Sequence, residues 1–159
     1  MGTTSIHPRQ AQAGFTIVEA LVALVILAIG LLGIAALHLD SLQAGRTAIH
    51  RTQAINLAAD LADRIRANRA ATVGYSIDLA ETAEAVAECA TTAGCTAADL
   101  AATDLATWKA SLATLLPAGD GSVGVGPVAA GTTTTYLITV TWSEVGQDDP
   151  SVFQLGFST

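Results

Sequence analysis

Apolar residues fill an unbroken stretch near the start of the chain. Between Ala20 and Leu37 no side chain is polar or charged, and this interval contains no proline. At a rise of about 1.5 Å per residue, the stretch would form a helix of roughly 27 Å, which is close to the hydrocarbon thickness of a bilayer. The pattern therefore predicts a single membrane-spanning helix, which we place at residues 15–39.

Beyond residue 39 the apolar positions are spaced as on one face of a helix. They recur at intervals of three and four, which predicts an amphipathic continuation over residues 40–69. This face comprises Ala54, Leu57, Ala58, Leu61 and Ile65. We expect one long helix from about Phe15 to about Asn68, whose second half packs on a globular head formed by residues 70–159.

The charged residues of the second half fit a helix that ends near Asn68. Asp60 and Arg64 are four residues apart and can pair on the side opposite the apolar face. Arg64, Arg66 and Arg69 suit the negative end of the helix dipole, and we interpret them as a solvated helix end.

The head is predicted to contain one further short helix. Thr96 and Asp99 have the spacing of a capping box, and Pro117 with Gly119 supplies a stop signal, which gives a helix over residues 97–116. Its apolar face is formed by Leu105, Trp108, Leu112 and Leu115. Residues 70–97 have weak periodicity and are expected to form a loop with one short helix.

The last third of the chain alternates apolar and polar residues. This alternation predicts strands at residues 136–143 and 153–157, joined by the polar residues 146–150, and Val123 with Val125 adds a short third strand. Residues 119–124 match Gly-x-Gly-x-x-Gly by letter, but they follow a helix and lead toward strands, so we interpret them as a turn. The expected fold class is α+β: a long N-terminal helix on a small antiparallel sheet, with one short helix.

Charge and the positions of the histidines argue against nucleic-acid binding, metal binding and catalysis. The 159 residues include 14 acidic, 7 basic and 3 histidine side chains, a net charge of −7, which disfavours nucleic-acid binding. His7, His38 and His50 are scattered, and no histidine accompanies the acids Glu81, Glu84 and Glu88. We therefore predict no enzyme activity, no cofactor, no metal site and no small-molecule substrate.

Glu19 is a carboxylate one turn inside the apolar helix. A charge at the centre of a bilayer costs roughly 2.5–3.5 kcal/mol on insertion scales, and less near the interface. Glu19 could reach back to headgroups and to the first-turn amides of its own helix. Alternatively, cleavage before Phe15 would create an α-amine four residues ahead, and between staggered helices such an amine could neutralise the Glu19 of a neighbouring chain.

Residues Gly14–Leu21 read Gly-Phe-Thr-Ile-Val-Glu-Ala-Leu, which resembles the N-terminal signal of type IV prepilins and pseudopilins. In that family a short polar leader ends in Gly, Phe follows, and Glu lies four residues after the Phe. The resemblance implies that a prepilin peptidase cuts between Gly14 and Phe15, removes residues 1–14 and N-methylates Phe15. It also implies a pilin fold, an inner-membrane helix and a periplasmic head.

Three segments of the head are similar to minor pilins of the PilV type, the type IV pilus modification proteins. They are residues 104–108 (Asp-Leu-Ala-Thr-Trp), 115–119 (Leu-Leu-Pro-Ala-Gly) and 140–142 (Val-Thr-Trp). This resemblance implies a low-abundance subunit that primes pilus assembly. Its implied partners are other minor and major pilins, a pilus tip adhesin and the inner-membrane assembly platform.

Other interpretations of the N-terminus remain open at this point. A pseudopilin of a type II secretion system shares the whole N-terminal signal, and a single-span periplasmic binding or enzyme domain would match it by accident. A cleaved secretory signal is a further alternative, although its apolar core is usually only about 7–15 residues long. Arg9 precedes the helix whereas Arg46 and Arg51 follow it, so the orientation rests on the resemblance and not on charge counting.

Cys89 and Cys95 bracket five small residues. A domain outside the cytoplasm permits a disulfide between them, which we prefer to two free buried thiols. The spacing is not that of a Cys-x-x-Cys redox site.

Overall fold

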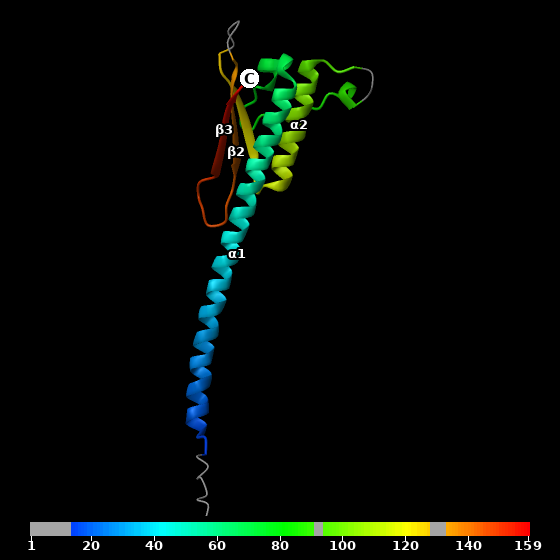
Figure 1. The fold of residues 1–159 in the computed structure, drawn as a ribbon. Helices are drawn as coiled ribbons and strands as arrows, with labels where there is room; N and C mark the ends of the chain where they lie inside the picture. Colours follow the sequence, from blue (N-terminus) through cyan, green and yellow to red (C-terminus); the bar gives the residue numbers. More distant parts are fainter. Residues whose placement is uncertain (1–13, 91–93, 128–132) are drawn as a thin grey trace, which may run out of the picture. The chain divides into compact units, whose positions relative to one another are not determined.

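The computed structural model describes residues 14–90, 94–127 and 133–159. The chain divides into two compact units, Met1–Leu42 and Gln43–Thr159. The predicted leader, apart from Gly14, lies outside the described residues, and so does Arg9. The elements, in chain order, are α1 (Ile17–Ala67), η1 (Arg69–Tyr75), η2 (Ala87–Ala90), α2 (Ala97–Leu115), β1 (Asp120–Val125), β2 (Thr135–Trp142) and β3 (Ser151–Ser158) (Figure 1).

The first unit contains the N-terminal part of α1. The helix begins at Ile17, two residues later than predicted, because Thr16 caps it: the Glu19 backbone N–H donates to Thr16 Oγ1 at 3.3 Å. The Ala20 N–H donates to the Thr16 carbonyl oxygen at 3.2 Å and closes the first turn.

The second unit holds the core of the protein. The buried positions of α1 all belong to this unit and comprise Ala54, Ala58, Leu61, Ala62 and Ile65. They follow the predicted face, except that Leu57 is half-buried and Ala62 is added. In Figure 1 this part of α1 lies beside α2, and both helices lie on one side of the sheet. The side chains that complete the core come from η1, α2, the strands and the residues just after η1 and α2: Ala71, Tyr75, Ile77, Ala101, Leu105, Trp108, Leu112, Leu116, Val123, Tyr136, Ile138, Val140 and Trp142.

The sheet has three antiparallel strands in the order β1-β2-β3. Its register pairs Val123 with Ile138 and Ile138 with Leu155. The predicted alternation is confirmed in β2, where Tyr136, Ile138, Val140 and Trp142 are buried and the residues between them are not. The α+β fold predicted for the chain is therefore confirmed.

The α2 helix begins as predicted and ends with a different burial pattern. Thr96 and Asp99 form a reciprocal capping box. Leu115 was expected on the apolar face but is 47% exposed, whereas Leu116 is 2% exposed. Proline disfavours helical geometry in the residue before it, so Leu116 leaves the helix in an extended conformation, and its side chain enters the core.

Two further expectations need correction. Residues 119–124 are not a turn, because Asp120–Val125 forms β1. Gly121 belongs in that strand because a Cβ there would collide with the Trp108 indole and with Leu112. The stretch after α1, expected to hold one short helix, contains two 3₁₀ segments, η1 and η2.

Candidate functional site

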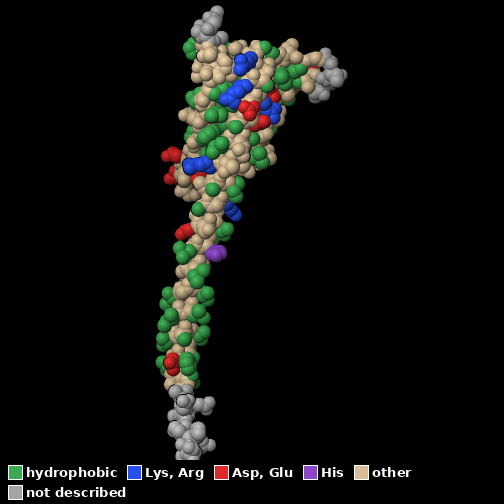
Figure 2. Space-filling view, viewed as in Figure 1, with side chains coloured by type: hydrophobic (Ala, Val, Ile, Leu, Met, Phe, Trp, Pro, Cys, Tyr) green, Lys and Arg blue, Asp and Glu red, His purple; other side chains and the backbone are tan. Residues whose placement is uncertain are grey.

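The apolar side chains in the first unit have no cover within the described chain. The large ones between Phe15 and Leu42 are from 53% exposed at Val22 to 81% exposed at Ile17. An 18-residue window of this helix has a mean hydropathy of 2.9 and is 0% buried. By length and composition the helix can cross a membrane. Figure 2 shows hydrophobic side chains along this segment, with acidic atoms near its start. Such a surface needs lipid or other helices around it.

The Gly14–Phe15 bond, whose cleavage the resemblance to prepilins implies, lies in an accessible segment. Gly14, Phe15 and Thr16 precede α1 and have no regular secondary structure. Phe15 is 73% exposed, and a Cβ placed on Gly14 would have nothing within 4 Å. A segment that is exposed and has no regular secondary structure is accessible to a peptidase.

Glu19 lies in the first turn of α1, where the positive end of the helix dipole favours an anion. Its backbone N–H is used by the Thr16 cap, while its side chain is exposed. Among the residues that the structure describes, no cation lies within ion-pair distance of its carboxylate. The geometry therefore leaves this carboxylate available to a group outside the described chain.

Glycines give the apolar helix places of close approach. A Cβ placed on Gly30 or on Gly33 would have nothing within 4 Å. Small residues at such positions let the backbones of two membrane helices come together. Neighbouring helices can therefore pack closely along this part of α1.

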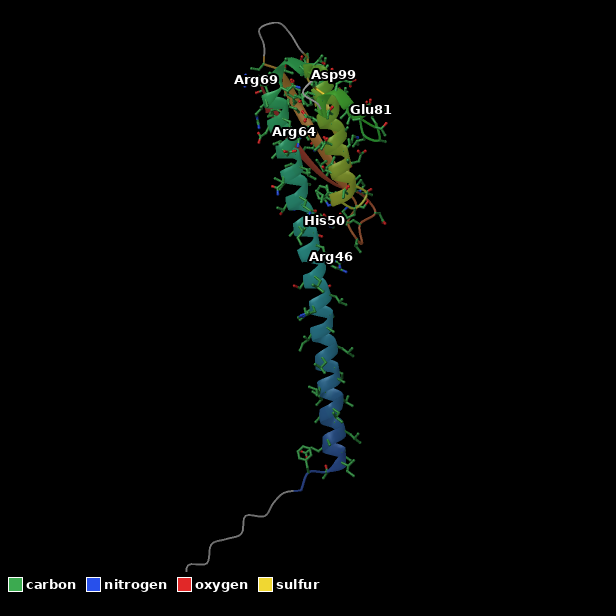
Figure 3. All side chains as sticks on the ribbon, turned by 90° about the vertical axis from the view of Figure 1, so that its right-hand side faces the viewer. Arg46, His50, Arg64, Arg69, Glu81 and Asp99 are labelled. Carbon is green, nitrogen blue, oxygen red and sulfur yellow. A yellow bond between two sulfur atoms is a disulfide. The ribbon has the colours of Figure 1, made fainter. Side chains whose placement is uncertain are left out.

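In the second unit, a polar network joins α1 to η1 and α2. Arg64 donates from Nε to Asp60 Oδ2 at 2.9 Å and from Nη1 to Asp104 Oδ1 at 3.0 Å. Tyr75 Oη donates to the other Asp104 oxygen at 2.8 Å, and Asn68 Nδ2 donates to Tyr75 Oη at 3.2 Å. Figure 3 shows Arg64 on the side of α1 that faces α2. The network fixes the second half of α1 to the head.

The network changes the titration of its members and the interpretation of the basic cluster. The hydrogen bond to Asp104 raises the pKa of Arg64 above its usual value, against the effect of burial. Burial raises the pKa of the Tyr75 hydroxyl to about 12. The Arg66 guanidinium pairs with Asp63 at 2.7 Å and lies 4.6 Å from the ring centroid of Phe157. Arg64 is half-buried and joins α1 to α2, so the expectation of a solvated helix end is too simple for this residue, whereas Arg66 remains exposed as expected.

A second polar contact joins α1 to the loop between β2 and β3. Glu144 is 8% exposed, and its carboxylate accepts from Trp142 Nε1 at 3.0 Å, Thr47 Oγ1 at 3.3 Å and Gln147 Nε2 at 3.4 Å. Beside it lies a hollow of about 460 Å³ lined by Gln43, Arg46, Thr47, His50, Pro117, Glu144 and Val145. The carboxylate is satisfied by its neighbours, and the contact supports the hairpin.

Two further contacts hold the head together. Trp108, predicted on the apolar face of this helix, is buried, and its Nε1 donates to the Leu57 carbonyl oxygen at 3.1 Å. Lys109 Nζ lies 2.7 Å from Asp120 Oδ1 and joins α2 to the start of β1. Burial alone would raise the pKa of the Asp120 carboxyl, but hydrogen bonds from Lys109 and from backbone amides hold this pKa below its usual value.

Cys89 and Cys95 form a disulfide, the arrangement preferred above to two free thiols. The bridge ties η2 to the residues just before the Thr96 cap of α2. Glu81, near this segment, accepts from the Asp78 backbone N–H at 2.9 Å. Within the described ranges, no group of three or more His, Cys, Asp or Glu side chains could hold a metal ion.

Sequence reasoning missed several residues of these sites, among them Thr16, Asp104 and Glu144. Thr16 had a usable signal, because Thr-x-x-Glu before an apolar run is the pattern of a helix start. Asp104 and Glu144 had none, because each is an acid in a sequence without another distinguishing feature. Their partners lie 40 and 97 residues away, at Arg64 and Thr47.

Two known families match segments of the chain that together contain α1. Residues 9–35 match the prokaryotic N-terminal methylation motif, and residues 36–106 match the family model described as type IV pilin Tt1218. The chain is similar to type IV pilins. The two matches adjoin and contain all of α1, whereas the sheet lies outside them. No match to the chain was found among the curated proteins or among the solved structures.

Proposed function

We propose that this chain is a minor subunit of a type IV pilus, with a structural and priming role. One observation carries the proposal: the methylation motif, residues 9–35, overlaps the start of a helix whose large apolar side chains are all exposed between Phe15 and Leu42. In a bilayer, lipid would cover this surface. In a filament, the same helices of neighbouring subunits would replace the lipid, because helix neighbours are equally apolar.

Processing is the first step of the proposed function. A prepilin peptidase would remove residues 1–14 and methylate the new amine of Phe15. The exposed, non-helical Gly14–Phe15 segment supports this step. The amine of one subunit would then pair with the free Glu19 carboxylate of a neighbour and set the stagger between their helices. A charge pair inside an apolar bundle is strongly favoured over two separate charges.

The location follows from the anchor. The chain would remain in the inner membrane as a single-pass protein, with residues 15–39 spanning the bilayer, until it enters the pilus. Residues 40–69 and the head, residues 70–159, would lie in the periplasm. The Cys89–Cys95 disulfide supports this orientation, because disulfides persist in oxidising compartments.

The subunit is proposed to be a minor pilin of the PilV type. The likeness of residues 104–108, 115–119 and 140–142 to that group supports this assignment. Its partners would be the other minor and major pilins, a tip adhesin and the inner-membrane assembly platform. A type II secretion pseudopilin is the alternative, and the match to a family described as a type IV pilin favours the pilus.

Incorporation into pili tests the proposal. Pili sheared from the native host are probed for the wild-type chain, for Glu19→Ala and for the control Asp40→Ala, which removes an acid from the same helix beyond the apolar stretch. We expect the wild type and Asp40→Ala in the pili at low abundance, and Glu19→Ala in the membrane but depleted from the pili. A wild-type chain absent from the pili would refute the function, and normal incorporation of Glu19→Ala would refute the charge pairing.

A further inference from the structure

The β3 strand is an open sheet edge. Among the described residues, β3 pairs only with β2, over eight register positions without a bulge. Figure 1 shows β3 at the margin of the head, away from α2. The opposite edge is partly closed, because Ile77 and Val123 exchange backbone hydrogen bonds of 3.2 Å and 2.9 Å.

The hydrogen-bond phase shows which backbone groups point outward. Thr134 and Thr159 exchange both backbone bonds, at 3.2 Å and 3.0 Å, next to the end of β3. Bonded and non-bonded pairs alternate in an antiparallel ladder, so the odd-numbered residues of β3 bond to β2. The even-numbered residues therefore direct their N–H and C=O groups away from the sheet: Val152, Gln154, Gly156 and Ser158.

This edge lacks the devices that normally protect an exposed strand. Proteins usually block such edges with charged residues, proline or bulges. The sequence of β3, Ser-Val-Phe-Gln-Leu-Gly-Phe-Ser, has no charged residue and no proline. The side chains on its core side, Phe153, Leu155 and Phe157, are only partly buried. An added strand would satisfy the outward backbone groups and would extend the cover over these apolar side chains.

We propose that β3 binds an extended segment of a partner polypeptide as a fourth strand of the sheet. The outward backbone groups of β3 can pair only with an extended chain. The partly exposed side chains of Phe153, Leu155 and Phe157 favour a segment with apolar residues at alternate positions. Charge sets the orientation. The exposed acids Asp148 and Asp149 lie just before β3, whereas Arg66, near its other end, is already paired with Asp63. A basic residue in the segment is therefore favoured beside Asp148 and Asp149.

A second copy of this chain fits the edge less well. If the β3 strands of two copies paired with their apolar side chains on the same face, they would have to run antiparallel. The elements that run along β3 would then point in opposite directions in the two copies. In Figure 1, β3 and the Gln43–Ala67 part of α1 run in the same general direction. Two chains anchored in one membrane run in parallel, so the choice of a different partner rests on the proposed function.

Hydrogen exchange of the β3 amides tests the proposal. Exchange is measured by mass spectrometry on the full chain in envelopes and sheared pili of its own host, and on the same chain purified in detergent micelles. We expect the four outward amides to exchange at least about tenfold more slowly in the host material. The inward amides of β3 should be protected in both samples. Equal exchange of the outward amides in both samples would overturn the proposal.

Substitutions at Gln154 separate edge blocking from unfolding. Gln154→Pro removes an outward N–H that β2 does not use, so it should fold but lose the protection of the other outward amides in host material. Gln154→Thr is the control and should keep that protection. If Gln154→Pro lowers the unfolding midpoint, Gly156→Lys serves as the second blocking variant. Retained protection in the folded blocking variant would overturn the proposal.

The remaining outcomes distinguish the possible occupants and the two proposals. Slower exchange with rising chain concentration in micelles would identify a second copy and overturn the heterologous partner. Protected amides in a chain that never reaches the pili would refute the pilus function and still support strand addition. A chain found in pili with unprotected outward amides would refute strand addition alone.

Discussion

Replacing Asp104 by alanine removes the acceptor that connects α1, η1 and α2. Asp104 is 8% exposed and accepts from Arg64 and from the wholly buried Tyr75. Without it the Tyr75 hydroxyl has no acceptor, which costs about 1–3 kcal/mol for a buried polar group. Arg64 keeps its pair with Asp60 and partial access to water, so its share is smaller, about 0.5 kcal/mol. The expected total is about 1.5–3.5 kcal/mol of unfolding free energy.

Two variants calibrate this value. Asp60→Ala removes the exposed half of the same arginine pairing, and it should cost only about 0.3–0.5 kcal/mol. Asp104→Asn keeps an oxygen for Tyr75 and loses the charge, and it should fall between the two. We therefore predict that the loss of unfolding free energy decreases from Asp104→Ala to Asp104→Asn to Asp60→Ala. This order follows from the burial of each carboxylate and not from the number of ion pairs lost.

Urea unfolding of the full chain in detergent micelles measures these differences. The two tryptophans, Trp108 and Trp142, are 2% and 1% exposed, so their fluorescence reports on the head. With a urea dependence of about 1–3 kcal/mol/M, Asp104→Ala should lower the midpoint by roughly 0.5–3.5 M. A loss for Asp104→Ala no larger than that for Asp60→Ala would refute the view that the network fixes α1 to the head.

Three further substitutions test the packing of the head by the same unfolding assay. Gly121→Ala should lower the free energy of unfolding by at least about 1–3 kcal/mol, because the added Cβ would collide with the Trp108 indole. Gly124→Ala is the control: its added Cβ would lie 3.9 Å from the nearest atom, so the loss should be under about 1 kcal/mol. Equal losses would contradict the close approach at Gly121. The pKa of Asp120 is lowered in the folded protein, so its carboxylate stabilises the fold above the usual pKa of 3.8, and this stabilisation is lost as the pH falls through the folded pKa. Asp120→Asn should therefore weaken the fall of the unfolding midpoint at acidic pH. An unchanged fall would contradict a stabilising role for the Asp120 carboxylate. The double variant Cys89→Ser, Cys95→Ser should lose about 2 kcal/mol by chain entropy, and a loss near zero would show that the bridge constrains little of the unfolded chain.

Periodicity predicted the elements that bury one continuous face. Ala54, Ala58, Leu61 and Ile65 of α1 are buried as their spacing indicated, and β2 alternates as its sequence indicated. An element that buries one continuous face must carry apolar residues at the regular spacing of that element, so a single sequence is sufficient to find it. The same reasoning failed at Leu115, because the chain leaves the helix before Pro117 and the repeat no longer applies.

The polar contacts could not be predicted in the same way. Arg64 and Asp104 are 40 residues apart, and their pairing depends on how α2 lies against α1. Glycines gave an ambiguous signal as well: Gly121 and Gly124 suggested a turn, whereas the structure needs Gly121 for close packing within a strand. The open edge of β3 also follows only from strand order, because nothing in its sequence identifies an edge strand.

The mature N-terminus of the native chain tests the central claim most directly. The chain is isolated from envelopes and pili of its own host, and its N-terminal peptide is sequenced by mass spectrometry. We predict that the polypeptide begins at Phe15 and that its amino group carries one additional methyl group. A native chain that retains residues 1–14 would contradict processing, and with it the packing of this helix into a pilus.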